Sequence, residues 1–244
     1  MGEEFYYKKP KIQIDVDNYD IIISIGNRCL TDLVINKRLR REFGSKRGIG
    51  FPFGSIPIQP HHILKYVKEI DEGKSLPTGF LEMDEASGIR FGGDYVGRTN
   101  KDEVWFGHYM GYGHAPNIPH DDLVESFTRK FKRLQDTMKG KKKVCFLYTS
   151  ESDVFNYQNS RYNDNYTDLI QLRDYIKKTY PDFKFDMVLI HTNKEYENEE
   201  NIFNYTIGVH EKFWTDDCIS GNRRRFTRPY RWFVTQYIKE IFGF

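Results

Sequence analysis

The sequence has few cysteines and little net charge, and both features exclude classes of protein. Its three cysteines, Cys29, Cys145 and Cys218, are odd in number, far apart and without a CxxC pair. This pattern argues against a disulfide framework and against a zinc ribbon. Lys and Arg number 37 against 35 Asp and Glu, a net charge of +2, so no strong overall field draws the chain to nucleic acid. We therefore expect a reduced, cytoplasmic protein with no nucleic-acid partner.

Long apolar runs are also missing, since none approaches the roughly 20 residues that a membrane span needs. The first 18 residues are too polar for a secretory signal and predict a lead-in to the fold. A hydrophobic fraction of 39% in 244 residues is typical of a soluble folded protein. We expect one α/β domain over residues 1–244, and the sequence equally fits one domain of a longer protein. It leaves the oligomeric state open.

Hydrophobic periodicity predicts an alternation of strands and helices. A strand, a tight turn and a helix open the fold, and helices and strands alternate again toward the end. This order predicts a Rossmann-like parallel or mixed sheet flanked by helices. The expected strands are 19–25, 103–109, 143–148, 185–191 and 202–209, with short ones near 88–91 and 94–96, and the expected helices are 29–41, 61–72, 123–138, 166–179 and 231–242.

Ligands of open α/β sheets bind where strands end and loops begin. The first such turn holds Gly26, Asn27 and Arg28, where a glycine allows close backbone approach and the next helix offers free N–H groups to an anion. A plain turn is the alternative. The loop after strand 143–148 holds Thr149, Ser150, Glu151 and Ser152. These hydroxyls and carboxylates suit a ribose, sugar or phosphate, or alternatively a helix cap.

Arginine is concentrated shortly before the last expected helix. Guanidinium groups match the geometry of a diphosphate, so this basic loop is a candidate clamp for a nucleotide leaving group. A solvated basic loop paired with acidic neighbours is the alternative. The arginines are Arg223, Arg224, Arg225, Arg228 and Arg231.

The histidines predict loop and strand-end side chains, one or two of them lining a pocket, rather than a metal site. His108, His114 and His120 are six residues apart in sequence, which matches neither a helical i, i+4 pair nor a zinc pattern. A DxD motif at residues 15–17 precedes a strand instead of following one, so we discount it as a metal–nucleotide site. We expect no divalent metal requirement and no tightly bound cofactor. His108, at the end of an expected strand, is the best candidate for a general base.

Cys29 has two interpretations. A thiol at the start of a helix has a stabilised thiolate, and with His108 or His114 it would form a nucleophilic Cys–His pair. Alternatively, it is a small buried side chain at the start of a helix.

Three stretches carry a family resemblance over roughly residues 19–150. The stretch YDIIISIGNRCLTDLVINKRLRREFGSKRGIGFPFGSI, the segment EVWFGHY and the stretch FTRKFKRLQDTMKGKKKVCFLY resemble a family of papain-like cysteine peptidases with an ISLGxxC turn, a PFDW element and an FxH segment. Here PFGSI lacks the Asp–Trp part of PFDW. The resemblance implies that Cys29 and His108 carry the Cys…His order. Similar modules accompany bacterial and algal-virus glycan-biosynthesis enzymes, which implies the host cytoplasm if the source is viral.

We expect a glycosyltransferase that moves a sugar from a nucleoside-diphosphate sugar to an oligosaccharide or glycoprotein acceptor. A UDP-sugar is the favoured donor, and the viral glycan context suggests a deoxyhexose such as rhamnose. The first alternative is a Cys–His hydrolase or acyl transferase with Cys29 as nucleophile. The second is a glycan-binding module without catalysis.

Overall fold

The chain forms two compact units, which we call the sheet unit and the helical unit. The sheet unit comprises Met1–Ile49, Lys143–Asp164 and Lys184–Phe244, and the helical unit comprises Gly50–Lys142 and Asn165–Phe183. A computed structural model of the chain describes residues 5–26, 29–54, 56, 58–84, 90–91, 94–95, 99–100, 102, 104, 106, 118–150, 166–209 and 223–244.

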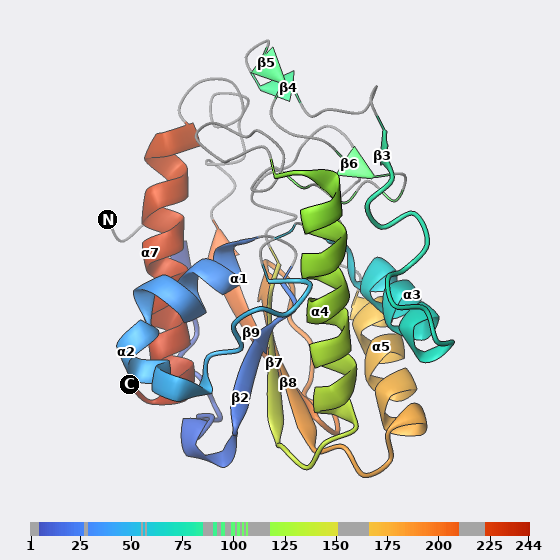
Figure 1. Cartoon of the computed structure of the whole chain (residues 1–244). Helices are drawn as coiled ribbons and strands as arrows, with labels where there is room; N and C mark the ends of the chain where they lie inside the picture. The colour runs from blue at the N-terminus through green and yellow to red at the C-terminus, as the bar shows by residue number, and fades with distance from the viewer. Residues whose placement is uncertain are drawn as a thin grey trace. The chain divides into compact units, whose positions relative to one another are not determined.

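Strands and helices alternate as the periodicity predicts (Figure 1). The strands are β1 (Phe5–Tyr7), β2 (Ile21–Ser24), β3 (Met83–Asp84), β4 (Arg90–Phe91), β5 (Asp94–Tyr95), β6 (Thr99–Asn100), β7 (Val144–Thr149), β8 (Phe185–Thr192) and β9 (Ile202–Val209). The α-helices are α1 (Cys29–Leu33), α2 (Arg40–Phe43), α3 (Pro60–Asp71), α4 (His120–Met138), α5 (Tyr166–Thr179) and α7 (Arg223–Phe242). A π-helix, η2 (Val34–Arg38), joins α1 to α2, and η1 (Val16–Asn18) and η3 (Gly44–Lys46) are 3-10 turns.

The sheet unit is built on a five-stranded mixed sheet in the order β1-β9-β8-β7-β2. Strands β2, β7, β8 and β9 are parallel, and β1 is antiparallel to β9. This confirms the expected α/β fold with a parallel or mixed sheet. The four parallel strands follow one another across the sheet in chain order, so the described sheet has no reversal of strand order among them. Their carboxyl ends therefore form one continuous edge.

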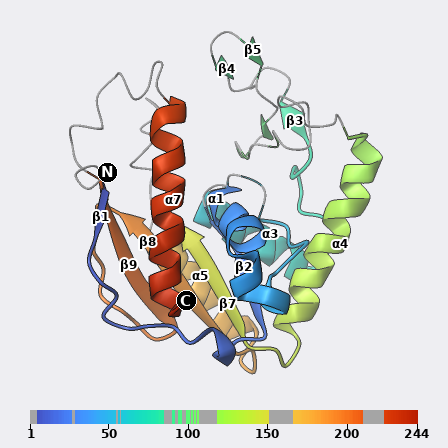
Figure 2. The same ribbon diagram turned by 90° about the vertical axis from the view of Figure 1, so that its left-hand side faces the viewer.

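Helices α1, η2, α2 and α7 cover one face of this sheet (Figures 1 and 2). Apolar side chains of η2, such as Val34 and Ile35, and of α7, such as Val234 and Ile238, pack with the sheet residues Cys145 and Leu147 and their neighbours. Burial strongly raises the pKa of the Cys145 thiol, with nearby Asp186 adding to the shift, so this cysteine is a core side chain. Every residue of β7 and β8 is buried, as is typical of parallel strands.

In the helical unit, α3 and α4 pack around a cluster of aromatic side chains. Phe80 is the centre of this cluster, since its ring lies 5.0–5.3 Å from the rings of Tyr66, Phe106, Phe127 and Phe131, each in an edge-on arrangement. The amphipathic patterns of α3 and α4 place their buried residues on this core.

Three sequence-based expectations differ from the structure. The expected lead-in contributes β1, because Tyr7 stacks on Tyr237 of α7 and β1 pairs with β9. The last helix begins at Arg223, so the arginine-rich segment is helical rather than a loop. The expected strand at 103–109 is not a strand at its described residues, Val104 and Phe106, which are buried in irregular backbone.

None of the helices in the part of the chain that the structure describes is long and apolar enough to cross a membrane.

Candidate functional site

The carboxyl ends of the parallel strands gather the polar residues expected at the site. Strand register aligns Ser24 with Leu147, and Thr149 with Ile190. Ser150 follows directly after β7 and is buried, as is Thr149. The structure therefore brings Gly26, Thr149 and Ser150 to one edge of the sheet, as the strand pattern predicts.

Gly26 lies at the end of the first strand, where the lack of a side chain is required by packing. A Cβ atom at this position would lie 2.1 Å from Thr31 Oγ1 and 3.5 Å from the backbone nitrogen of Thr149. Thr31 is the third residue of α1, and its hydroxyl lies 2.5 Å from the Thr149 hydroxyl in a buried hydrogen bond. The Thr31 side chain, whose hydrogen bond to Thr149 links α1 to β7, therefore occupies the space beside Gly26. Close approach of a ligand to this glycine stays a prediction.

A second hydrogen bond joins the ends of β7 and β8. The Thr192 hydroxyl donates to the Ser150 carbonyl at 2.8 Å, and the Ser150 N–H donates to the Ile190 carbonyl at 2.8 Å. On β2, the strand next to β7, the Ser24 hydroxyl is buried and has no hydrogen-bond partner among the described residues. The edge is therefore a layer of buried hydroxyl groups that bond the strand ends and α1 to one another, with the Ser24 hydroxyl left over.

His191 is a buried histidine of this edge that the sequence analysis did not select. Its Nε2 lies 2.9 Å from Asn204 Oδ1, and the Asn204 amide donates through Nδ2 to the Glu197 carbonyl at 2.5 Å. Because that donor faces Glu197, Oδ1 accepts from His191, so Nε2 carries the proton. The ring of Tyr196 packs edge-on against the imidazole at 4.7 Å. The only sequence signal was a polar residue near the end of an apolar strand.

The amino end of α7 points toward the carboxyl edge of the sheet. Near its other end, the Ile241 carbonyl accepts from the N–H of Ile14, ahead of β2, and Phe242 packs on Phe43. A helix of 20 residues spans about 30 Å, slightly more than a strand of eight. The arginines expected to clamp a diphosphate therefore start α7 at this edge. They are Arg224, Arg225 and Arg228.

Several expected site residues lie outside the described residues. These are Asn27, Arg28, His108, His114, Glu151 and Ser152. Cys29 is described as the first residue of α1, which confirms its expected place at the start of a helix.

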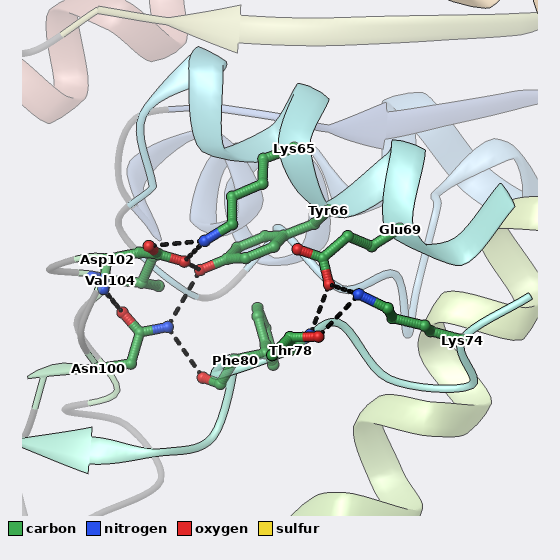
Figure 3. Close-up of polar contacts among 9 residues, drawn as sticks. All are labelled: Lys65, Tyr66, Glu69, Lys74, Thr78, Phe80, Asn100, Asp102 and Val104. Atoms are coloured by element: carbon green, nitrogen blue, oxygen red, sulfur yellow. Dashed lines mark hydrogen bonds and ion pairs between the residues drawn. The ribbon is translucent and has the colours of Figure 1, made fainter. Parts of the chain in front are cut away.

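The segment that leads to His108 is anchored by a buried asparagine (Figure 3). Asn100 donates from Nδ2 to the Tyr66 hydroxyl at 3.1 Å and to the Phe80 carbonyl at 2.9 Å. Its Oδ1 accepts from the N–H groups of Asp102 at 3.0 Å and Val104 at 2.9 Å. All four bonds of the amide are thereby made, which fixes Asn100 and the backbone N–H groups of Asp102 and Val104 near Tyr66 of α3.

Asp102 extends the same network to α3. Its carboxylate accepts from Lys65 at 2.6 and 2.8 Å and from the Tyr66 hydroxyl at 2.7 Å. Burial acts to raise the pKa of the Asp102 carboxyl, but the bonds from Lys65 and Tyr66 outweigh it and the pKa is lowered. Burial and the bond to Asp102 both raise the pKa of Tyr66. The network is therefore a fixed ion pair that supports the backbone.

The histidines of α3 differ in their surroundings. Desolvation by burial, with repulsion from His61, lowers the pKa of His62 to about 4, so His62 is neutral at neutral pH. His61 Nδ1 lies 3.4 Å from Asp168 Oδ2 of α5. Among the residues that the structure describes, no group of three or more His, Cys, Asp or Glu side chains is placed to hold a metal ion.

Comparisons with protein-family models, with curated proteins and with solved structures gave no match.

Proposed function

We propose that this chain is a glycosyltransferase that moves a sugar from a nucleoside-diphosphate sugar to a glycan acceptor. The observation that carries the proposal is the carboxyl edge of the four parallel strands. It combines the polar residues Thr149 and Ser150, and the Ser24 hydroxyl that has no partner among the described residues, with the arginine-rich start of α7. Hydroxyl groups bond to a ribose or sugar, and guanidinium groups neutralise a diphosphate.

The transfer itself needs a base and a stabilised leaving group. The acceptor hydroxyl attacks the anomeric carbon of the donor, the bond from that carbon to the diphosphate oxygen breaks, and the hydroxyl proton passes to a base. We assign the base to His108, which follows the anchored residues Asn100, Asp102 and Val104 in sequence. The nucleoside diphosphate leaves with the electron pair of the broken bond. The arginines of α7 balance its charge, which removes the need for a divalent metal.

A UDP-sugar is the proposed donor, and a deoxyhexose such as rhamnose is the proposed sugar. The acceptor is an oligosaccharide or glycoprotein. In this scheme Cys29, at the start of α1, has no covalent role.

A Cys–His hydrolase or acyl transferase is the second candidate, because Cys29 begins α1, the helix that follows the parallel strand β2. A helix start lowers the pKa of a thiol and so favours the nucleophilic thiolate. His108 or His114 would then be its base.

The experiment compares His108→Ala, Cys29→Ser and, as a matched control, His120→Ala, whose side chain is exposed at the start of α4. We expect His108→Ala to lose at least about 100-fold in turnover of the UDP-sugar. Cys29→Ser and His120→Ala should keep most of the activity, because sugar transfer needs no thiolate.

Loss of all activity in a folded Cys29→Ser variant would instead establish the hydrolase or acyl transferase. A wild-type protein that binds glycans and ignores nucleotides would be a glycan-binding module. Calorimetric titration with UDP and with an oligosaccharide separates these two outcomes.

A further inference from the structure

The helices α3 and α5 of the helical unit lie side by side and run in the same direction (Figure 1). At their amino ends, His61 Nδ1 lies 3.4 Å from Asp168 Oδ2. Further along, the Tyr175 hydroxyl donates to Asp71 Oδ2 at 2.9 Å, and Lys68 Nζ lies 5.4 Å from the centre of the Tyr175 ring. The two amino ends, each of which carries a partial positive charge, are therefore close together.

Two histidines in direct contact occupy the start of α3. The ring centroids of His61 and His62 are 4.0 Å apart. The His61 side chain is 51% exposed and faces the carboxylate of Asp168, whose side chain is 13% exposed. A protonated His61 therefore has both water and an opposite charge beside it, so it takes up a proton without any rearrangement of the two helices.

The surroundings of His62 disfavour a positive charge. Its Nδ1 atom is buried and has no hydrogen-bond partner among the described residues. A protonated imidazole is a donor at both nitrogens, so the proton on Nδ1 would be a buried donor without an acceptor. The charge would also lie beside His61 and at the positive end of the α3 dipole.

Among the described residues, the other charged side chains around the two histidines are Lys65 on α3, Asp102 after β6, and Asp168 on α5. Lys65 and Asp102 already form an ion pair at 2.6 Å (Figure 3). Desolvation by burial, with repulsion from His61, lowers the pKa of His62 to about 4; attraction from Asp102 opposes this shift and Lys65 adds to it. The acidic side chains therefore do not offset the cost of charging His62.

We propose that the amino ends of α3 and α5 form an acid-operated latch, in which protonation of His62 releases the start of α3 from α5. The first proton enters at His61 and leaves the latch closed, because Asp168 balances its charge. The second proton enters at His62, whose ring must then leave its buried position to reach water or an acceptor. This latch lies within the helical unit and does not depend on the proposed sugar transfer.

The sign of the pH dependence follows from the two states of His62. Its pKa is about 4 in the closed latch and about 6.5 when the ring is exposed to water, so opening takes up a proton. Opening is therefore favoured as the pH falls from 6.5 to 4, and the latch is fully closed above that range.

Hydrogen exchange followed by NMR between pH 7.5 and pH 4.5 tests the latch on the whole chain. The reporters are the amides of His62 and Ile63, which donate to the Gln59 carbonyl at 3.1 and 3.2 Å. The amide of Gly73, which donates to the Ile70 carbonyl at 3.0 Å beyond the other end of α3, is the internal reference. After correction for the intrinsic pH dependence of exchange, we expect opening at the reporters to rise about 10-fold from pH 6 to pH 4.5. Opening at the reference should change little.

His62→Phe removes the titrating group and keeps an aromatic ring near Tyr66, whose ring centroid lies 6.3 Å away, so the rise should be absent. His61→Asn removes the neighbouring charge, so the rise should be smaller than in the wild type. His120→Asn is the matched control, because His120 is an exposed histidine beside Asp121 at the start of α4. It should show the wild-type rise, and circular dichroism checks that each variant is folded.

Opening that does not depend on pH at the wild-type reporters would overturn the latch. An unchanged rise in folded His62→Phe would also overturn it, and would assign the release to protonation of Asp168 or Asp102. If His62→Phe does not fold, His61→Asn decides, because a rise equal to that of the wild type would show that the two histidines are not coupled. An equal rise at the Gly73 reference would refute a local release.

Discussion

Replacing Gly26 with alanine tests how the start of α1 is attached to the sheet. The new Cβ would lie 2.1 Å from Thr31 Oγ1 and 3.0 Å from Thr31 Cβ. Thr31 is fully buried, and its hydroxyl is bonded to that of Thr149. The alanine therefore has no free space and must displace this threonine.

The expected free-energy change combines three effects. Overpacking a buried site costs about 1–3 kcal/mol, and losing the bond between Thr31 and Thr149 costs about 1 kcal/mol more. Alanine also lowers the conformational entropy of the unfolded chain, which stabilises the folded state by about 0.4–1 kcal/mol. We expect a net destabilisation of about 2–3 kcal/mol, which lowers the Tm by roughly 4–12 °C in a protein of this size.

Urea unfolding of Gly26→Ala, Thr31→Ala and the double variant measures this directly. Thr31→Ala removes the oxygen that the new Cβ would meet, so Gly26→Ala should cost at least about 1 kcal/mol less in that background. Additive effects in the double variant would refute the packing explanation. A fully stable Gly26→Ala that no longer binds UDP would show that the glycine is needed for ligand approach instead.

Two further predictions concern the helical unit. Asn100→Ala removes four buried hydrogen bonds, so we expect thermal unfolding to show a loss of about 3–4 kcal/mol, and a loss under 1 kcal/mol would contradict the anchoring role. The pKa of His62 is about 4 in the folded chain and about 6.5 when unfolded, so the unfolded chain binds this proton first and stability falls as the pH drops from 6.5 to 4. Because solvent screens part of this effect, we expect the free energy of unfolding to fall by about 1–2 kcal/mol over this pH range. His62→Phe should remove that part of the pH dependence in urea titrations, and an unchanged pH profile would show that His62 is not the group responsible.

Long, strongly periodic segments are predictable from the sequence because each carries its own signal. The helix predicted at 166–179 is α5, and those predicted at 123–138 and 61–72 are α4 and α3 within a few residues. The buried strands β2, β7 and β8 are marked by short apolar runs, and β9 by its position after them. Alternation of these segments is sufficient to predict the sheet and its carboxyl edge.

Features that depend on distant contacts could not be predicted. β1 is a three-residue strand whose stability comes from Tyr7 against Tyr237, more than 200 residues away. The start of α7 contains an arginine run and Pro229, which locally favour a loop, and packing of the helix outweighs that preference. The amide network of Asn100 and the bond from His191 to Asn204 join residues whose neighbours only the fold determines.

Calorimetric titration of the wild-type chain with UDP and with UDP-sugars tests the central proposal most directly. We predict saturable binding of UDP without added metal, and weaker binding when Arg224 and Arg225 are both replaced by alanine. UDP should also be released from the donor when a glycan acceptor is present. Turnover of an ester or peptide that alkylation of Cys29 abolishes, with no binding of any nucleotide, would contradict this proposal.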